Sequence, residues 1–197
     1  GTTSVALCAT FLREQGAWVD TYIPDRYSEG YGISEQGIEY EADKEVSLVI
    51  ALDCGIKALG QAALAKEKGI DLIVCDHHTP GERLPDALAV LDPKRKDCGY
   101  PYKELSGCGV GFKLLEAYCQ QEGIKKKKLW PLLDLLAVSI AADIVPITGE
   151  NRILCHYGLQ RLNKDPRPGL KALIDNASLK TPLKISNVVF GIAPRIN

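Results

Sequence analysis

The chain has 197 residues, of which 46% are hydrophobic and 25% are charged, a balance that excludes a largely disordered chain. Its 24 Lys and Arg residues nearly match its 25 Asp and Glu residues, so no overall positive field draws it onto nucleic acid. Seven cysteines without a C-x-x-C pair favour reduced thiols in the cytoplasm over a secreted disulfide framework, and no apolar run is long enough to span a membrane.

Alternating strand and helix patterns fill the first ninety residues. Helices are expected over 2–15, 34–42 and 57–68, and strands over 17–24, 46–52, 70–75 and 87–91, with a Gly- and Tyr-rich loop over 25–33. The strand at 46–52 is apolar throughout, which indicates burial on both faces. Helices are expected over 107–121, 129–142, 151–163 and 168–176. We therefore predict an α/β fold, a doubly wound, mainly parallel sheet with helices on both faces, followed by a helical C-terminal part.

Each of the last three predicted strands ends in an aspartate, namely Asp53, Asp76 or Asp92. Open α/β sheets bind their ligands at the carboxyl ends of the strands, so these acids are candidates for a functional site. The alternative is local, because aspartate also caps helices and begins turns; Asp53 would then cap the helix near Lys57. For Asp92, which precedes a proline, we expect only the turn.

Two of the three histidines in the chain, His77 and His78, directly follow Asp76. Adjacent side chains leave a strand in different directions, so this trio suits one metal ligand, one orienting partner and one substrate contact. Imidazole together with carboxylates suits Mn²⁺, Fe²⁺ or Zn²⁺; the alternative is a turn with surface histidines. Asp143 is a further candidate, because an acid in an apolar stretch is costly to bury unless it is paired or binds a metal. Its alternative is a helix cap.

Small residues begin the helix predicted near residue 107, in the sequence Ser-Gly-Cys-Gly-Val-Gly over 106–111. Backbone amides at a helix N-terminus can bind an anion, which makes Ser106, Gly107 and Gly109 candidate substrate contacts. The alternative is that small residues permit close helix packing. The run lacks both the G-x-G-x-x-G spacing and the Lys-Ser/Thr of a P-loop, which disfavours a domain for an organic nucleotide cofactor.

The stretches ALDCG (51–55), VCDHH (74–78) and AADIVP (141–146) occur in an order that resembles the DHH phosphoesterase superfamily. Further stretches resemble the catalytic core of its RecJ-type exonucleases: EGYGIS (29–34), LDPKRKDCGYPYKELSGCGVGFKL (91–114), GENRIL (149–154), RPGLKALI (167–174) and GIAPRIN (191–197). The resemblance covers nearly the whole chain. RecJ-like proteins carry a D-x-D-x-D-G strand end before this first helix, and Gly1 matches its last letter. We therefore interpret residues 1–197 as a DHH catalytic domain truncated at both ends, without the first metal motif and the C-terminal domains, and expect this fragment to be inactive.

The resemblance also implies a role for each matching residue. Asp53 would bridge two metal ions, His77 and Asp143 would be ligands, Asp76 a ligand or an orienting group, and His78 would face the scissile phosphate. These five form the expected catalytic set, and all except His78 form the expected metal set. Arg195 would lie near a substrate phosphate, and Arg26 and Tyr31 belong to a loop expected to approach the nucleic acid.

The implied activity is metal-dependent phosphodiester hydrolysis, as a 5′-to-3′ exonuclease on single-stranded DNA that releases 5′-mononucleotides. Two Mn²⁺ or Mg²⁺ ions are the expected cofactors. A helicase and a single-strand-binding protein are partners implied by the resemblance alone. The alternatives are a DHH phosphodiesterase acting on short oligonucleotides or cyclic dinucleotides, a pyrophosphatase, and a non-catalytic DHH-like scaffold. The presence of all four expected metal ligands disfavours the scaffold.

Overall fold

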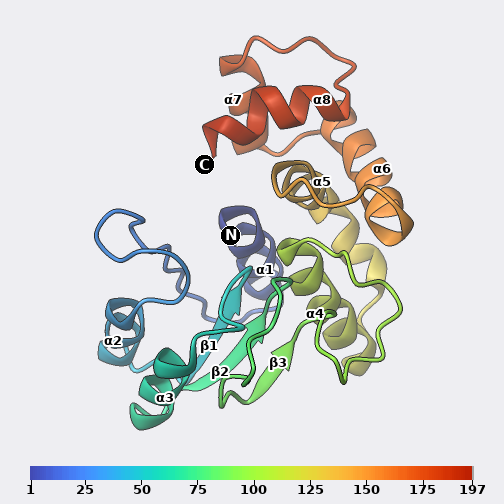
Figure 1. The fold of residues 1–197 in the computed structure, drawn as a ribbon. Coiled ribbons are helices and arrows are strands. Elements are labelled where there is room, and N and C mark those ends of the chain that lie inside the picture. The colour runs from blue at the N-terminus through green and yellow to red at the C-terminus, as the bar shows by residue number, and fades with distance from the viewer. Residues whose placement is uncertain (197) are drawn as a thin grey trace.

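A three-stranded parallel sheet forms the centre of the N-terminal part of the computed structural model, which describes residues 1–196 (Figure 1). The strands are β1 (Leu48–Leu52), β2 (Asp71–Cys75) and β3 (Ala89–Leu91), in the order β1-β2-β3. Leu52 pairs with Cys75, and Cys75 pairs with Leu91, so the three strands end level with one another. The residues that follow them therefore emerge along one edge of the sheet.

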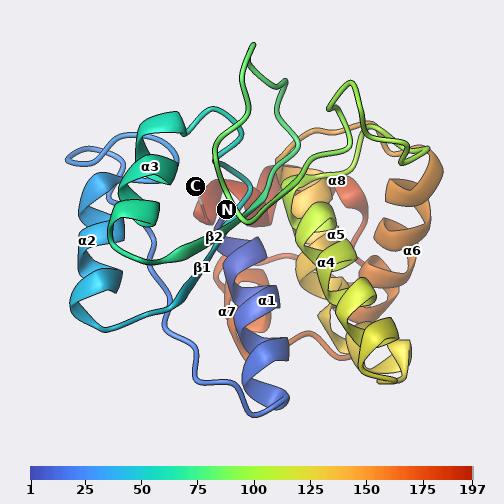
Figure 2. The same ribbon diagram turned by 90° about the horizontal axis from the view of Figure 1, so that it is seen from below.

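Helices cover both faces of this sheet, which confirms the predicted α/β class. They are α1 (Thr2–Glu14), α2 (Glu35–Asp43), α3 (Leu59–Glu67), α4 (Gly107–Gln121), α5 (Leu133–Ala142), α6 (Gly149–Lys164), α7 (Pro168–Asn176) and the short α8 (Ile185–Asn187). A 3₁₀ helix (Lys126–Leu132) precedes α5, and a π-helical turn (Val188–Ile192) and a 3₁₀ turn (Ala193–Arg195) follow α8. In Figure 2, α2 and α3 lie on one side of the strands, and α4, α5 and α6 lie on the other.

The two-residue repeat of β2 explains why both faces are covered. Leu72 and Val74 belong to the core cluster shared with α2 and α3, whereas Cys75 belongs to the larger cluster shared with α1, α4 and α5. A strand that is apolar on both faces needs a helical layer on each face.

The C-terminal helices pack as a further layer through two specific contacts. On α6, a Cβ atom added to Gly158 would lie 2.1 Å from the carbonyl oxygen of Leu133, so only glycine lets α6 approach the start of α5 this closely. Arg167, which precedes α7, forms a salt bridge with Asp134 of α5, with Nη2 donating to Oδ1 at 2.8 Å. These contacts place the C-terminal part against α5.

Two expectations from the sequence need correction. Residues 17–24 form no strand, because they do not pair with the open edge of β1, and Trp18 and Ile23 are exposed. Strand β1 is buried only toward its C-terminal end, since it lies at an edge of the sheet and leaves Leu48 43% exposed.

The seven cysteines are all free thiols, five of them buried. Within residues 1–196, no helix is both long enough and apolar enough to cross a membrane.

Candidate metal centre

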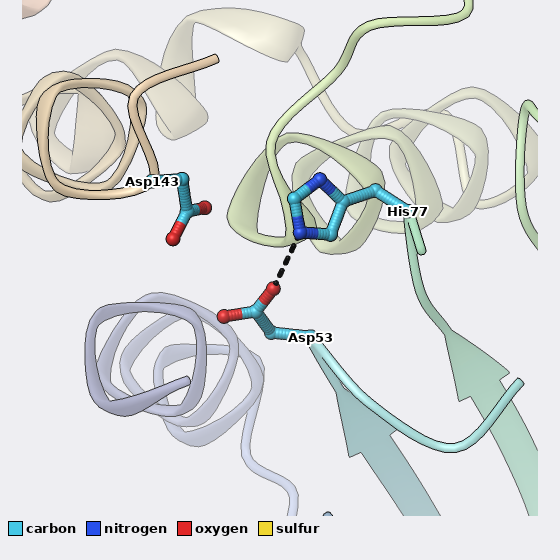
Figure 3. A group of neighbouring side chains, drawn as sticks. All are labelled: Asp53, His77 and Asp143. Carbon is cyan, nitrogen blue, oxygen red and sulfur yellow. Dashed lines mark ion pairs between the residues drawn. The ribbon is translucent and has the colours of Figure 1, made fainter. Parts of the chain in front are cut away.

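Asp53, His77 and Asp143 converge at the carboxyl edge of the sheet (Figure 3). One ligand atom from each residue lies within 4.8 Å of the others. Asp53 directly follows β1 and His77 lies two residues after β2, while Asp143 caps the C-terminal end of α5. The backbone N–H of Asp53 donates to the carbonyl of Cys75 at 2.8 Å, which continues the β1–β2 pairing into the site. Parallel pairing thus joins two of the ligands, and helix packing adds the third.

The imidazole of His77 is held between a backbone carbonyl and a carboxylate. Its Nδ1 lies 3.1 Å from the carbonyl oxygen of Leu105, and its Nε2 lies 3.1 Å from Oδ1 of Asp53. A carbonyl oxygen and a carboxylate both only accept hydrogen bonds, so the protonated imidazole can donate to both. When a cation binds at Nε2, the carbonyl of Leu105 can keep the remaining proton on Nδ1.

The charges at this site favour a cation. Burial works against protonation of His77, but the carboxylate of Asp53 outweighs it and raises the pKa of the imidazole. Burial also works against ionisation of Asp53, yet its contact with His77 lowers its pKa. Burial raises the pKa of Asp143, and the charge of Asp53 raises it further. Two buried carboxylates side by side require positive charge between them.

Asp76, expected as a ligand or an orienting group, lies outside this group of three. Its carboxylate accepts hydrogen bonds from the backbone N–H groups of Ile56 (2.9 Å), His77 (2.7 Å) and His78 (3.2 Å), and it lies 2.6 Å from Nδ1 of His78. These contacts suit the orienting role, one of its two expected roles. The side chain of His78 is 46% exposed, and its ring meets that of His77 edge to face at 4.6 Å between centroids.

Residues 106–109, the expected anion cradle, are engaged in local contacts. Ser106 caps α4 by accepting a hydrogen bond from the amide of Gly109 at 3.1 Å, so that amide is not free for a substrate. Ser106, Gly107 and Gly109 are all buried. A Cβ atom on Gly107 would lie 1.8 Å from Oδ1 of Asp53. These contacts are those of the alternative interpretation, in which small residues permit close packing.

A cavity of about 680 Å³ adjoins the metal centre and contains two of the expected substrate contacts. Arg26, Tyr31 and Asp53 all line it, together with residues of α1 and the open edge of β1. The guanidinium of Arg26 lies 5.4 Å from the ring centre of Tyr31. Burial and then the charge of Asp53 raise the pKa of Tyr31, which places this ring in the field of the metal centre.

Arg195 lies in the C-terminal 3₁₀ turn, where Nε donates to the side-chain oxygen of Asn176 and Nη1 to the carbonyl of Gly191. It is thereby tied to the C-terminal layer. The contribution of Leu105 was not foreseen from the sequence, and no side-chain pattern could reveal it, because only its backbone carbonyl contacts His77.

The residues of the centre fit a divalent metal. One imidazole nitrogen and two carboxylates form a donor set suited to Mn²⁺, and Oδ1 of Asp53 is a buried oxygen without a hydrogen bond. Among residues 1–196, this is the one group of at least three His, Cys, Asp or Glu side chains with ligand atoms close enough for an ion.

Comparison with known proteins places the chain in a family. The family model described as "DHH family, N-terminal domain" matches residues 1–140, so the chain belongs to the DHH family. It is 42% identical over its whole length to the single-stranded-DNA-specific exonuclease RecJ of Bacillus subtilis, and 38% identical to that of Salmonella typhimurium. The chain spans 24% and 36% of the lengths of these two relatives.

Solved structures agree with this assignment. The crystal structure of an exonuclease RecJ bound to manganese matches all of this chain and 49% of its own, with a TM-score of 0.88 and 35% identity. RecJ of Thermus thermophilus in complex with Mn²⁺ matches with a TM-score of 0.79 and 31% identity, and in complex with Mg²⁺ with 0.68 and 29%. These matches cover all of this chain and 28% and 24% of those chains.

Proposed function

We propose that this DHH-family chain is the metal-binding core of a RecJ-type exonuclease, which hydrolyses single-stranded DNA from the 5′ end and releases 5′-mononucleotides. The observation that carries the proposal is the convergence of Asp53, His77 and Asp143 at the carboxyl edge of the sheet. The proposal is also supported by the similarity of this whole chain to parts of enzymes named single-stranded-DNA-specific exonucleases.

Asp53, His77 and Asp143 would hold Mn²⁺ or Mg²⁺, the ions present in the similar RecJ structures. When bound, such an ion supplies Lewis-acid activation of a phosphoryl oxygen and a more acidic water. Oxygen ligands suit either ion, and the imidazole favours Mn²⁺. Two ions stay part of the proposal, and Asp53 would contribute to holding both.

Groups around the metal centre would bind and orient the substrate. The carboxylate of Asp76 holds Nδ1 of His78, which leaves Nε2 of this exposed ring to meet the scissile phosphate. Arg26 supplies a cation for a neighbouring phosphate, and the ring of Tyr31, 75% exposed, supplies a face on which a base can stack. Arg195 is proposed as a further phosphate contact, because its guanidinium carries the same positive charge as that of Arg26.

The proposal extends to cellular context. A cytoplasmic location accords with seven free thiols, and a helicase and a single-strand-binding protein are proposed as partners by family resemblance. Co-purification of either protein with the tagged natural polypeptide would test these partners.

The test is degradation of DNA by the natural polypeptide that carries this sequence. It is incubated with Mn²⁺ and single-stranded DNA labelled at the 5′ or the 3′ end, with a dinucleotide as a competing substrate. Asp53→Ala is the test variant. Asp175→Ala is the control, because it removes an exposed carboxylate on α7 that pairs only with Lys171 of the same helix.

Processive loss from the 5′ end that is abolished in Asp53→Ala and retained in Asp175→Ala would support the proposal. Cleavage of the dinucleotide alone would assign the protein to the phosphodiesterases of small substrates. Absence of hydrolysis for both substrates would favour the non-catalytic scaffold.

A further inference from the structure

The start of helix α4 contacts both ligands that follow the strands. Leu105 precedes the helix, Ser106 caps it and Gly107 is its first helical residue. The carbonyl of Leu105 faces His77, and the backbone of Gly107 faces Asp53. One short segment, remote in sequence from both ligands, thus lies directly behind the metal centre.

The contact with Asp53 leaves no room for a side chain at position 107. An added Cβ atom would lie 1.8 Å from Oδ1, 2.4 Å from Cγ and 2.6 Å from Cβ of Asp53. These distances are far below van der Waals contact, and they involve the whole side chain rather than a flexible tip. Asp53 itself has a φ of 64°, in the left-handed region, so its backbone offers little freedom to move away.

The contact with His77 orients its ring. Because the carbonyl oxygen of Leu105 lies 3.1 Å from Nδ1, it can accept a hydrogen bond there while Nε2 faces the ion. The cap formed by Ser106 fixes where the helix begins, and so fixes the position of both neighbours.

We propose that the start of α4 positions the metal centre, with Gly107 as a positioning residue for the carboxylate of Asp53 and the Leu105 carbonyl as a positioning group for His77. This inference rests on the proposed function, since it assigns how the same centre is held. It replaces the substrate-contact role first expected of Gly107. Partners that orient metal ligands typically affect metal affinity by about 10–100-fold.

The first test is Mn²⁺ binding by calorimetry to Gly107→Ala. We expect the affinity to fall by about tenfold or more, because the carboxylate is displaced. Gly60→Ala is the matched control: it is the same change in the first turn of α3, where an added Cβ atom meets nothing within 4 Å. The Mn²⁺ affinity of Gly60→Ala should stay within about twofold of the affinity of the unmodified protein. Unchanged affinity in Gly107→Ala would overturn the assignment of Gly107.

The second test remains informative if Gly107→Ala folds poorly. Thermal unfolding is measured for Gly107→Ala, Asp53→Gly and the double variant. If the clash is with the Asp53 side chain, Gly107→Ala should lower the melting temperature of the unmodified protein and have little effect in the Asp53→Gly background. Equal losses in both backgrounds would show that another contact is responsible and would overturn the inference.

The third test concerns the ring of His77. In the protein loaded with Mg²⁺, long-range ¹H–¹⁵N NMR spectra should show the proton of His77 on Nδ1, because Leu105 accepts it there while Nε2 faces the ion. A proton on Nε2 would contradict the role of Leu105. The unfolding cycle needs neither metal nor DNA, and the NMR measurement needs no DNA. If both succeed while single-stranded DNA is not degraded, the proposed function fails and the positioning role stands.

Discussion

The salt bridge between Asp134 and Arg167 lends itself to a quantitative prediction, because its two partners differ sharply in exposure. The side chain of Asp134 is 1% exposed and that of Arg167 is 23% exposed. Nε of Arg167 lies 3.0 Å from both carboxylate oxygens, and its Nη2 also donates to the carbonyl of Pro131 at 3.0 Å. Removing either partner leaves the other charge uncompensated, and the cost depends on how well water can reach it.

Arg167→Ala leaves a fully buried carboxylate with only backbone N–H partners, so we expect a loss of about 3–5 kcal/mol in the free energy of unfolding. Asp134→Ala should cost less, toward about 3 kcal/mol, because the guanidinium can turn to water and keep its contact with Pro131. In a domain of this size, each kcal/mol lost lowers the melting temperature by about 2–4 °C, so a loss of about 3 kcal/mol should lower it by about 6–12 °C.

The assay is reversible thermal unfolding followed by circular dichroism at pH 7. The control is Asp175→Ala, which breaks a pair with Lys171 whose side chains are both 62% exposed and which is worth about 0.3–0.5 kcal/mol. If Arg167→Ala were no more costly than this control, or if Asp134→Ala were the more destabilising of the pair, the reasoning from desolvation would be wrong.

Three further predictions concern the metal centre and the layer behind it. Asp143→Ala should remove measurable Mn²⁺ binding in calorimetry, because it deletes one of three ligands; retained affinity would exclude Asp143 from the site. Mn²⁺ affinity should rise by about tenfold per pH unit up to the raised pKa of His77 and then level off, because the metal must displace the proton of His77. Calorimetry across this pH range measures the affinity, and an affinity that does not change with pH would contradict the prediction. Gly158→Ala should cost about 1–3 kcal/mol in thermal unfolding, because its Cβ atom would overlap the carbonyl of Leu133; unchanged stability would show that α6 can move away.

The raised pKa of His77 also has a consequence for stability in the absence of metal. A folded-state pKa above the ordinary value means that the His77–Asp53 pair stabilises the fold fully below the ordinary imidazole pKa. This contribution is lost as the pH rises through the raised value. Metal affinity and metal-free stability therefore change in opposite directions over the same pH interval.

Much of the fold was accessible from local patterns. The runs at 46–52 and 70–75 are short, apolar and followed by acids, and their observed strands end at Leu52 and Cys75. The segment 17–24 shows the limit of this reasoning. Its alternating residues are compatible with a strand, but a strand exists only when a neighbour supplies hydrogen bonds, and a local pattern contains no information about that neighbour.

By itself, the sequence determined the parallel sheet and the chemical types gathered at its carboxyl edge, because buried strands and the residues that end them leave strong local signals. Only the tertiary structure decided which of these residues meet. It left Asp76 outside the group of three and brought in Asp143, which the family resemblance had implied, from the end of α5. It also placed Leu105 and Gly107 behind the ligands. The physical reason is that ligation depends on the direction in which each side chain leaves its element, and on backbone groups that helix packing brings close from far along the chain.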